Sequence, residues 1–126
     1  MLQQKFTKIA IAGKCEFTPG GSLNADSGLA TAAAGAATLS KMAGTVTTEA
    51  LVTAAVTDYT LTLTNKTIAA ADIVLVSVSN GTNTTAGVTV GRVTPGAGSV
   101  VILIRNLHAT VALNGTLRIS FLVVKA

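Results

Sequence analysis

An alternation of apolar and polar residues with a period of two runs through the chain from Gly44 onward. Val, Ile and Thr, which favour extended backbone, recur there in short segments separated by turn-forming residues. The segments are DYTLTLTN, DIVLVSVSN, AGVTVGRVT, GSVVILIRN and ATVALNGTLRISFLVVK. No helix-length amphipathic segment lies between them, which argues against a parallel sheet of strand-helix-strand units. The pattern predicts an all-β fold, either an antiparallel β-sandwich or a jelly roll.

Three places between the apolar segments carry turn signals. Asn80-Gly81 and Asn114-Gly115 are residue pairs that tolerate the positive φ angles of a tight type I′ hairpin. In the segment TPGAGS, Pro95 suits the first central position of a turn, and a glycine follows it. We therefore predict a chain reversal at each of the three places.

The composition changes near Lys41. From Lys14 to Lys41 the chain is dominated by Gly, Ala, Ser and Thr, with a Pro-Gly-Gly turn signal at Pro19. The alanines of residues 28–37 would permit a helix, but the glycines and threonines among them weaken it. We interpret this part as an extended arm and the preceding KFTKIAIAG as a short strand. The chain then divides into an N-terminal strand and extended arm, residues 1–43, and a β-sandwich domain, residues 44–126.

The composition also limits the partners. A chain of 126 residues matches one domain, but only 11% of its residues are charged, against about 25% in typical soluble domains. The net charge of +4 is spread evenly, and three Phe, one Tyr and no Trp leave little on which bases could stack. We therefore expect no nucleic-acid partner. Because no apolar run approaches about 20 residues, we also expect no membrane insertion.

Some strands are apolar on both faces. In GSVVILIRN, the residues Val100, Ile102 and Ile104 alternate with a second set that is also largely apolar. A two-layer sandwich buries only the inner face of each strand, so the second face predicts a partner subunit, most simply in a symmetric homo-oligomer. The candidate interface residues are Val101, Leu103, Arg105, His108, Leu122 and Val124.

The residues that could support catalysis are few. The chain has one histidine, His108, which excludes a His-rich metal site. It has one cysteine, Cys15, which excludes paired-thiolate zinc sites and an internal disulfide. Neither Ser99 nor Ser120 lies in a G-x-S-x-G elbow that would suit a triad with His108. The glycine-rich GRVTPGAGS lacks the Gly-Lys-Ser/Thr ending of a phosphate loop. The five acids are scattered: Glu16, Asp26, Glu49, Asp58 and Asp72. We predict no enzyme, cofactor or metal.

Four N-x-T sequons occur, but the apolar core IAIAG is too short for a signal peptide. We therefore attribute the sequons to turn asparagines beside threonines and expect the protein to be made inside the cell.

The segment from Lys41 to Ala126 resembles the Thr- and Val-rich C-terminal β-domain of structural proteins of tailed bacteriophages, notably small head decoration or cement proteins. The likeness lies in AGTVTTEALVTA, LTLTN, GTNTTAGVTV and ALNGTLRISFLVVKA. The resemblance implies a trimeric β-sandwich, made in the host cytoplasm, that binds the major capsid protein on the outer surface of the virion and stabilises the shell. It brings no catalytic residue.

Two alternatives stay open. Similar domains look to be present in phage fibres and spikes, so the chain could be a tail fibre, spike or other tail-associated virion component. A carbohydrate-binding module is less favoured, because its aromatic platform is hard to build from three Phe and one Tyr.

Overall fold

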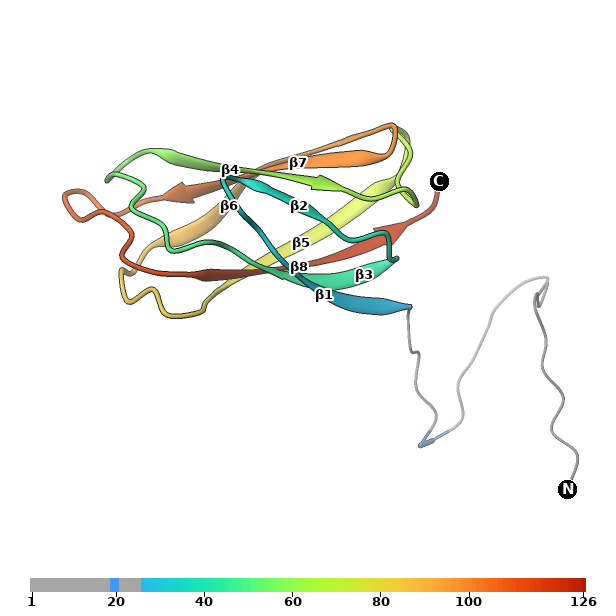
Figure 1. The fold of residues 1–126 in the computed structure, drawn as a ribbon, viewed down its shortest axis with the longest axis horizontal. Coiled ribbons are helices and arrows are strands. Elements are labelled where there is room, and N and C mark those ends of the chain that lie inside the picture. The colour runs from blue at the N-terminus through green and yellow to red at the C-terminus, as the bar shows by residue number, and fades with distance from the viewer. Residues whose placement is uncertain (1–18, 21–25) are drawn as a thin grey trace, which may run out of the picture.

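The structure of the protein is a computed structural model that describes residues 19–20 and 26–126. Across these residues the chain forms eight strands and no helix, and the strands make two four-stranded sheets packed face to face (Figure 1). The predicted all-β sandwich is therefore confirmed. The predicted strand KFTKIAIAG and Cys15 lie outside the described residues. Within the described part, no helix exists that could cross a membrane.

The strands follow one another along the chain with short connections. They are β1 (Ser27–Thr31), β2 (Ala36–Thr38), β3 (Ala43–Thr47), β4 (Asp58–Thr64), β5 (Ile73–Asn80), β6 (Val88–Gly96), β7 (Ser99–Asn106) and β8 (Leu117–Val124). The first sheet has the order β1-β3-β8-β5 and the second sheet the order β2-β4-β7-β6.

The sequence pattern predicts antiparallel sheets, but each sheet of the structure is mixed. β1 runs parallel to β3 and β2 runs parallel to β4, while all other neighbours are antiparallel. The parallel pairs arise because the chain passes from the first sheet to the second and back again between β1 and β3. Two strands separated by such a crossover point in the same direction.

The first two strands lie within residues 1–43, where the sequence predicts an arm. β1 and β2 are edge strands of the two sheets, and Ala32, just after β1, and Ala37, within β2, are buried. Small residues make this packing possible: a Cβ on Gly44 would lie 2.7 Å from the carbonyl oxygen of Gly28. The predicted boundary at residue 44 is therefore too late, since the sandwich already includes β1.

The core lies between the sheets and is built from alternate residues of the long strands. Val100, Ile102 and Ile104 of β7 are fully buried, as the alternation predicts. The inward face of β8 is also buried and consists of Leu117, Ile119, Phe121 and Val123. Full burial of one such side chain contributes about 1.5 to 3 kcal/mol to folding, so this alternation fixes which face of each strand points inward.

The predicted reversal in TPGAGS is confirmed, but at a different pair of residues. Ala97 and Gly98 connect β6 to β7, and Gly98 has a φ of +77°. Pro95 lies inside β6, opposite Val100, rather than in the turn. β6 is an edge strand, where a residue without a backbone N–H can be tolerated.

The predicted hairpins at the two Asn-Gly pairs are wrong. Neither pair has positive φ. Asn80 is the last residue of β5, and the connections at the two pairs span residues 81–87 and 107–116 rather than two residues. The two Asn-Gly-Thr segments instead lie against each other beyond the ends of β5 and β8. The Gly81 N–H donates to the Thr116 carbonyl at 2.9 Å, and a Cβ on Gly115 would lie 2.6 Å from Thr82 Oγ1. Glycine is needed here for close approach of two chain segments rather than for a tight turn.

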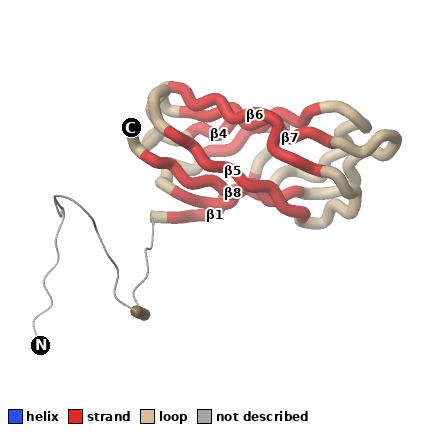
Figure 2. The backbone as a smooth tube through the Cα atoms, turned by 180° about the vertical axis from the view of Figure 1, so that it is seen from behind, coloured by secondary structure: helices blue, strands red, loops and turns tan. Residues whose placement is uncertain are grey.

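The loops gather at two ends of the sandwich (Figure 2). β1 begins and β8 ends at the same end, because Ser27 pairs with Ala43, which in turn pairs with Leu122 (Figure 1). The paired Asn-Gly-Thr segments lie at the opposite end, beside the Asn80 and Leu117 pair.

Candidate functional site

The six residues predicted as a subunit interface fall in three separate places. Val101, Leu103 and Arg105 lie on the outer face of the second sheet, Leu122 and Val124 on the outer face of the first sheet, and His108 in the connection after β7. The sequence pattern indicates which residues of a strand point outward but not which sheet the strand joins. The two outer faces point in opposite directions, so these residues cannot form one surface.

The outer face of the first sheet carries an exposed cluster of large aliphatic side chains, here called the apolar patch. It consists of Ile73, Leu75, Leu122 and Val124. Ile73 pairs with Val124 and Leu75 pairs with Leu122 across β5 and β8. Their exposed fractions are 57%, 55%, 39% and 40% in the order Ile73, Leu75, Leu122, Val124. The interface prediction omits Ile73 and Leu75, although both faces of DIVLVSVSN are apolar and give the signal for them.

The rest of this face is polar except for Leu29 on the edge strand β1, which pairs with Thr45 and is 84% exposed. Beyond the apolar patch, Ser77 pairs with Ser120, whose hydroxyl shares a 2.9 Å hydrogen bond with that of Thr45 on β3. Arg118 follows, exposed, between Ser79 and Thr47. On β5 and β8 the outward side chains are therefore apolar toward the end of β8 and polar toward its start.

The outer face of the second sheet is different in character. Val101 lies between Thr62 and Thr94, and the neighbouring strand positions are also threonines or charged residues. Val101 is only 36% exposed. On this face the apolar side chains of Val101 and Leu103 are flanked by polar side chains of both neighbouring strands, and no apolar pair spans two strands as in the apolar patch.

A shallow hollow of about 440 Å³ lies on this second face, toward the end that carries the Asn-Gly-Thr segments. We call it the arginine hollow, and its lining residues are Asp58, Thr89, Gly91, Arg92, Leu103 and Arg105. Arg105 Nη1 donates to Asp58 Oδ1 at 3.0 Å, and both side chains are about one third exposed. Arg92 is exposed and makes no ion pair with any residue that the structure describes.

The described acidic residues serve structural contacts. Glu49 accepts hydrogen bonds from the Gly35 N–H at 2.8 Å and from the Tyr59 hydroxyl at 3.0 Å. Burial, together with the hydrogen bond to the Glu49 carboxylate and its charge, raises the pKa of Tyr59 above its usual range. Asp26 pairs with Lys41 at 3.1 Å on the surface. Among residues 26–126, no cluster of three His, Cys, Asp or Glu side chains could hold a metal ion.

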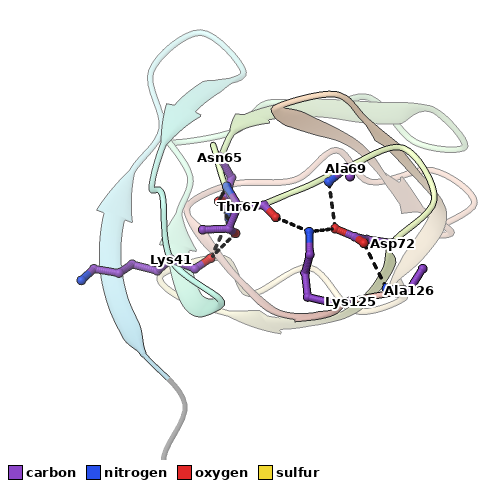
Figure 3. Close-up of polar contacts among 7 residues, drawn as sticks. All are labelled: Lys41, Asn65, Thr67, Ala69, Asp72, Lys125 and Ala126. Atoms are coloured by element: carbon purple, nitrogen blue, oxygen red, sulfur yellow. Dashed lines mark hydrogen bonds and ion pairs between the residues drawn. The ribbon is translucent and has the colours of Figure 1, made fainter. Parts of the chain in front are cut away.

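The C-terminal residues are held by a polar clasp on the β4–β5 connection (Figure 3). Lys125 Nζ donates to Asp72 Oδ2 and to the Thr67 carbonyl. The N–H groups of Ala69 and Ala126 donate to the same carboxylate at 2.8 and 3.2 Å. The bond from Lys125, followed by that from Ala69, lowers the pKa of Asp72 to about 2. The clasp explains why Asp72 is buried although it is charged.

Asn65 joins this clasp to the start of β3. Its side chain is fully buried, and its Nδ2 donates to the Lys41 carbonyl at 2.7 Å (Figure 3). Its Oδ1 accepts from the Thr67 N–H and hydroxyl. The amide is therefore used to fold the loop, and it is not an accessible sequon.

His108 also organises a loop. Its Nδ1 accepts from the N–H groups of Thr110 and Val111 at 3.2 and 3.0 Å, and its own N–H donates to Asn106 Oδ1. Ser99 lies at the other end of β7, about 23 Å away at the rise of an extended strand. Ser120 belongs to the first sheet and bonds to Thr45. The structure therefore brings neither serine to His108.

Comparison with protein-family models, curated proteins and solved structures finds no match to this chain. The apolar patch and the arginine hollow on the two outer faces are the features that bear on function.

Proposed function

We propose that this chain is a bacteriophage virion structural protein that decorates the outer surface of the capsid as a homotrimer and stabilises it. The observation that carries the proposal is the apolar patch: four large aliphatic side chains exposed together in a chain with only 11% charged residues. A cluster of this kind on a folded domain indicates a contact with another protein. The sequence resemblance to head decoration proteins supplies the identity of that contact.

The mechanism is adhesive. In this proposal the apolar patch is covered by a neighbouring copy in the trimer. Ile73 and Leu75 keep more than half of their surface exposed, so covering each contributes about 1 kcal/mol. Because each subunit gains this free energy, the sum over the trimer can offset the entropy lost on association. The major capsid protein is the second partner, and the linked subunits of one trimer bind the shell together, which raises the overall avidity.

The hydrogen bonds and ion pairs that the described acids and His108 make within the fold support a binding role over a catalytic one. Each makes a hydrogen bond or ion pair that folds a loop or joins two strands. A tail-associated location is the alternative, and it is separated from decoration by where the chain lies in an intact particle.

The trimer is tested by sedimentation equilibrium of the wild type and of two variants. Leu75→Glu places a charge in the apolar patch, whereas Thr62→Glu places the same charge on an exposed position of the opposite face. We expect the wild type and Thr62→Glu to sediment as trimers and Leu75→Glu as monomers. Circular dichroism of both variants checks that each is still folded.

Capsid binding is tested with shells that lack the protein. Purified chain is added, unbound protein is removed by pelleting the shells, and the complex is imaged by electron microscopy. Decoration predicts density on the outer shell surface at regular positions. A wild type that stays monomeric at tens of micromolar and leaves the shells bare contradicts the proposal.

A further inference from the structure

The arginine hollow exists because β6 contains one extra residue. Val90 pairs with Ile104 and Arg92 pairs with Leu103, so Gly91 has no partner on β7 and forms a β-bulge. Before the bulge, Val88 and Val90 pack against the core. In a regularly paired strand Arg92, two positions after Val90, would point into the core as well.

The bulge therefore reverses the two faces of the strand. After it, Val93 packs against the core and Arg92 faces outward. Bulges that redirect a side chain are frequent beside binding sites. Gly91 adds no side chain of its own, so the surface above Leu103 stays open between the two arginines.

Register places the two arginines close to each other. Arg92 lies opposite Leu103, and Arg105 is two residues further along the same strand, opposite Thr89. Diagonal neighbours of this kind have Cα atoms about 7 to 8 Å apart, within reach of long side chains. Two guanidinium groups thus border the hollow, whereas Asp58 supplies its only carboxylate.

Within the part of the chain that the structure describes, the donors of this pair are largely unused. Arg105 gives one hydrogen bond to Asp58, while a guanidinium has five N–H donors. Asp58 also holds the Arg105 side chain in place, which reduces the entropy lost on binding an anion. Two arginines and one aspartate leave an excess of one positive charge at the hollow.

We propose that the arginine hollow docks an acidic side chain of the shell protein, so that the second sheet faces the capsid while the apolar patch of the first sheet faces a sister subunit. This inference rests on the proposed function. Guanidinium pairs carboxylates in a bidentate manner. A nucleic acid would need a longer basic track and stacking aromatics, and the hollow has only two arginines and no aromatic residue.

The test uses Arg92→Glu, which reverses one charge of the hollow without removing the Asp58 to Arg105 pair. Lys66→Glu is the matched control, because it changes the net charge equally at an exposed position in the β4–β5 connection. Affinity for shells that lack the protein is measured by pelleting at several salt concentrations. Sedimentation equilibrium shows whether each variant is still a trimer.

We expect Arg92→Glu to bind the shells at least about tenfold more weakly, with a reduced dependence on salt. Lys66→Glu should bind within about twofold of the wild type, since its charge lies outside the contact. If the wild type binds and Arg92→Glu binds equally well, the hollow is not the docking site although decoration stands. A wild type that does not bind shells at all overturns both proposals, and preferential binding to DNA overturns the assignment to an acidic protein.

Discussion

Thr82 and Thr116 cap each other at the end of the sandwich. The Thr82 N–H donates to Thr116 Oγ1 at 2.9 Å, and the Thr116 N–H donates to Thr82 Oγ1 at the same distance. The two residues stand at equivalent positions of the two Asn-Gly-Thr segments, so the same tripeptide is used twice in one reciprocal contact. This contact joins the β5–β6 and β7–β8 connections.

Thr116→Val should lower the free energy of unfolding by about 0.5 to 1.5 kcal/mol, because it removes the acceptor of the exposed Thr82 N–H. Thr82→Val should cost a similar amount. The double variant should cost less than the sum, since the two bonds belong to one contact. Urea unfolding measures all three, and Thr60→Val on an exposed strand position serves as the control. Fully additive effects would contradict the reciprocal contact.

Gly115→Ala should destabilise the protein by about 1 to 3 kcal/mol. Its Cβ would lie 2.7 Å from the backbone nitrogen of Asn83, and backbone cannot move aside as a flexible side chain can. Gly96→Ala is the matched control, because its Cβ would meet nothing closer than 3.7 Å and its φ is not positive. Thermal unfolding should separate the two variants, and equal midpoints would show that the segments do not approach closely in solution.

The clasp at Asp72 should make stability depend on pH in the acid range. The pKa of Asp72 is lowered to about 2, below its ordinary value of about 4. Its contribution is therefore complete above about pH 4 and is lost as the pH falls toward 2. Asp72→Asn should be less stable than the wild type at neutral pH, and the difference should shrink between pH 4 and 2. A difference that is constant with pH would refute the clasp as drawn in Figure 3.

Tyr59 should resist ionisation at high pH. It is the one tyrosine of the chain, so ultraviolet absorbance reports its phenol alone. Burial and the bond to Glu49 raise its pKa, and a raised pKa gives stability that is complete below about pH 10 and is lost at higher pH. We expect phenolate to appear only as the fold is lost. Glu49→Gln should bring ionisation to lower pH, because the neighbouring negative charge is removed.

The alternation of residues was enough to predict the long strands and their inward faces. Val100 and Ile119 belong to regular runs in which burial alone decides orientation, so period two carries the information. The sequence could not reveal the face of Arg92, because one unpaired glycine shifts the parity of β6. It also could not show that Leu103 and Leu122 lie on opposite faces, since sheet membership depends on tertiary pairing.

The small residues of the N-terminal part misled the sequence interpretation for a physical reason. Gly28 and Ala37 carry little apolar surface and have weak strand propensity, so no local signal marks β1 and β2. Their position comes from fitting closely against β3 and β4, where larger residues would clash. The same limit applies to the Asn-Gly pairs, whose local preference for a hairpin is overridden by their contact with each other.

The alternation of the chain between the two sheets determines how the protein can assemble. From β1 to β6 each strand belongs to the sheet opposite to that of the strand before it. Neither layer can therefore form from one continuous stretch, and no hairpin among these strands can act as a local nucleus. Apart from β6 and β7, which are joined by a two-residue turn, the described strands meet their sheet neighbours only after long loops close. This places the protein among slow-folding β proteins with times of about milliseconds to seconds. The two layers should appear together, in one cooperative step.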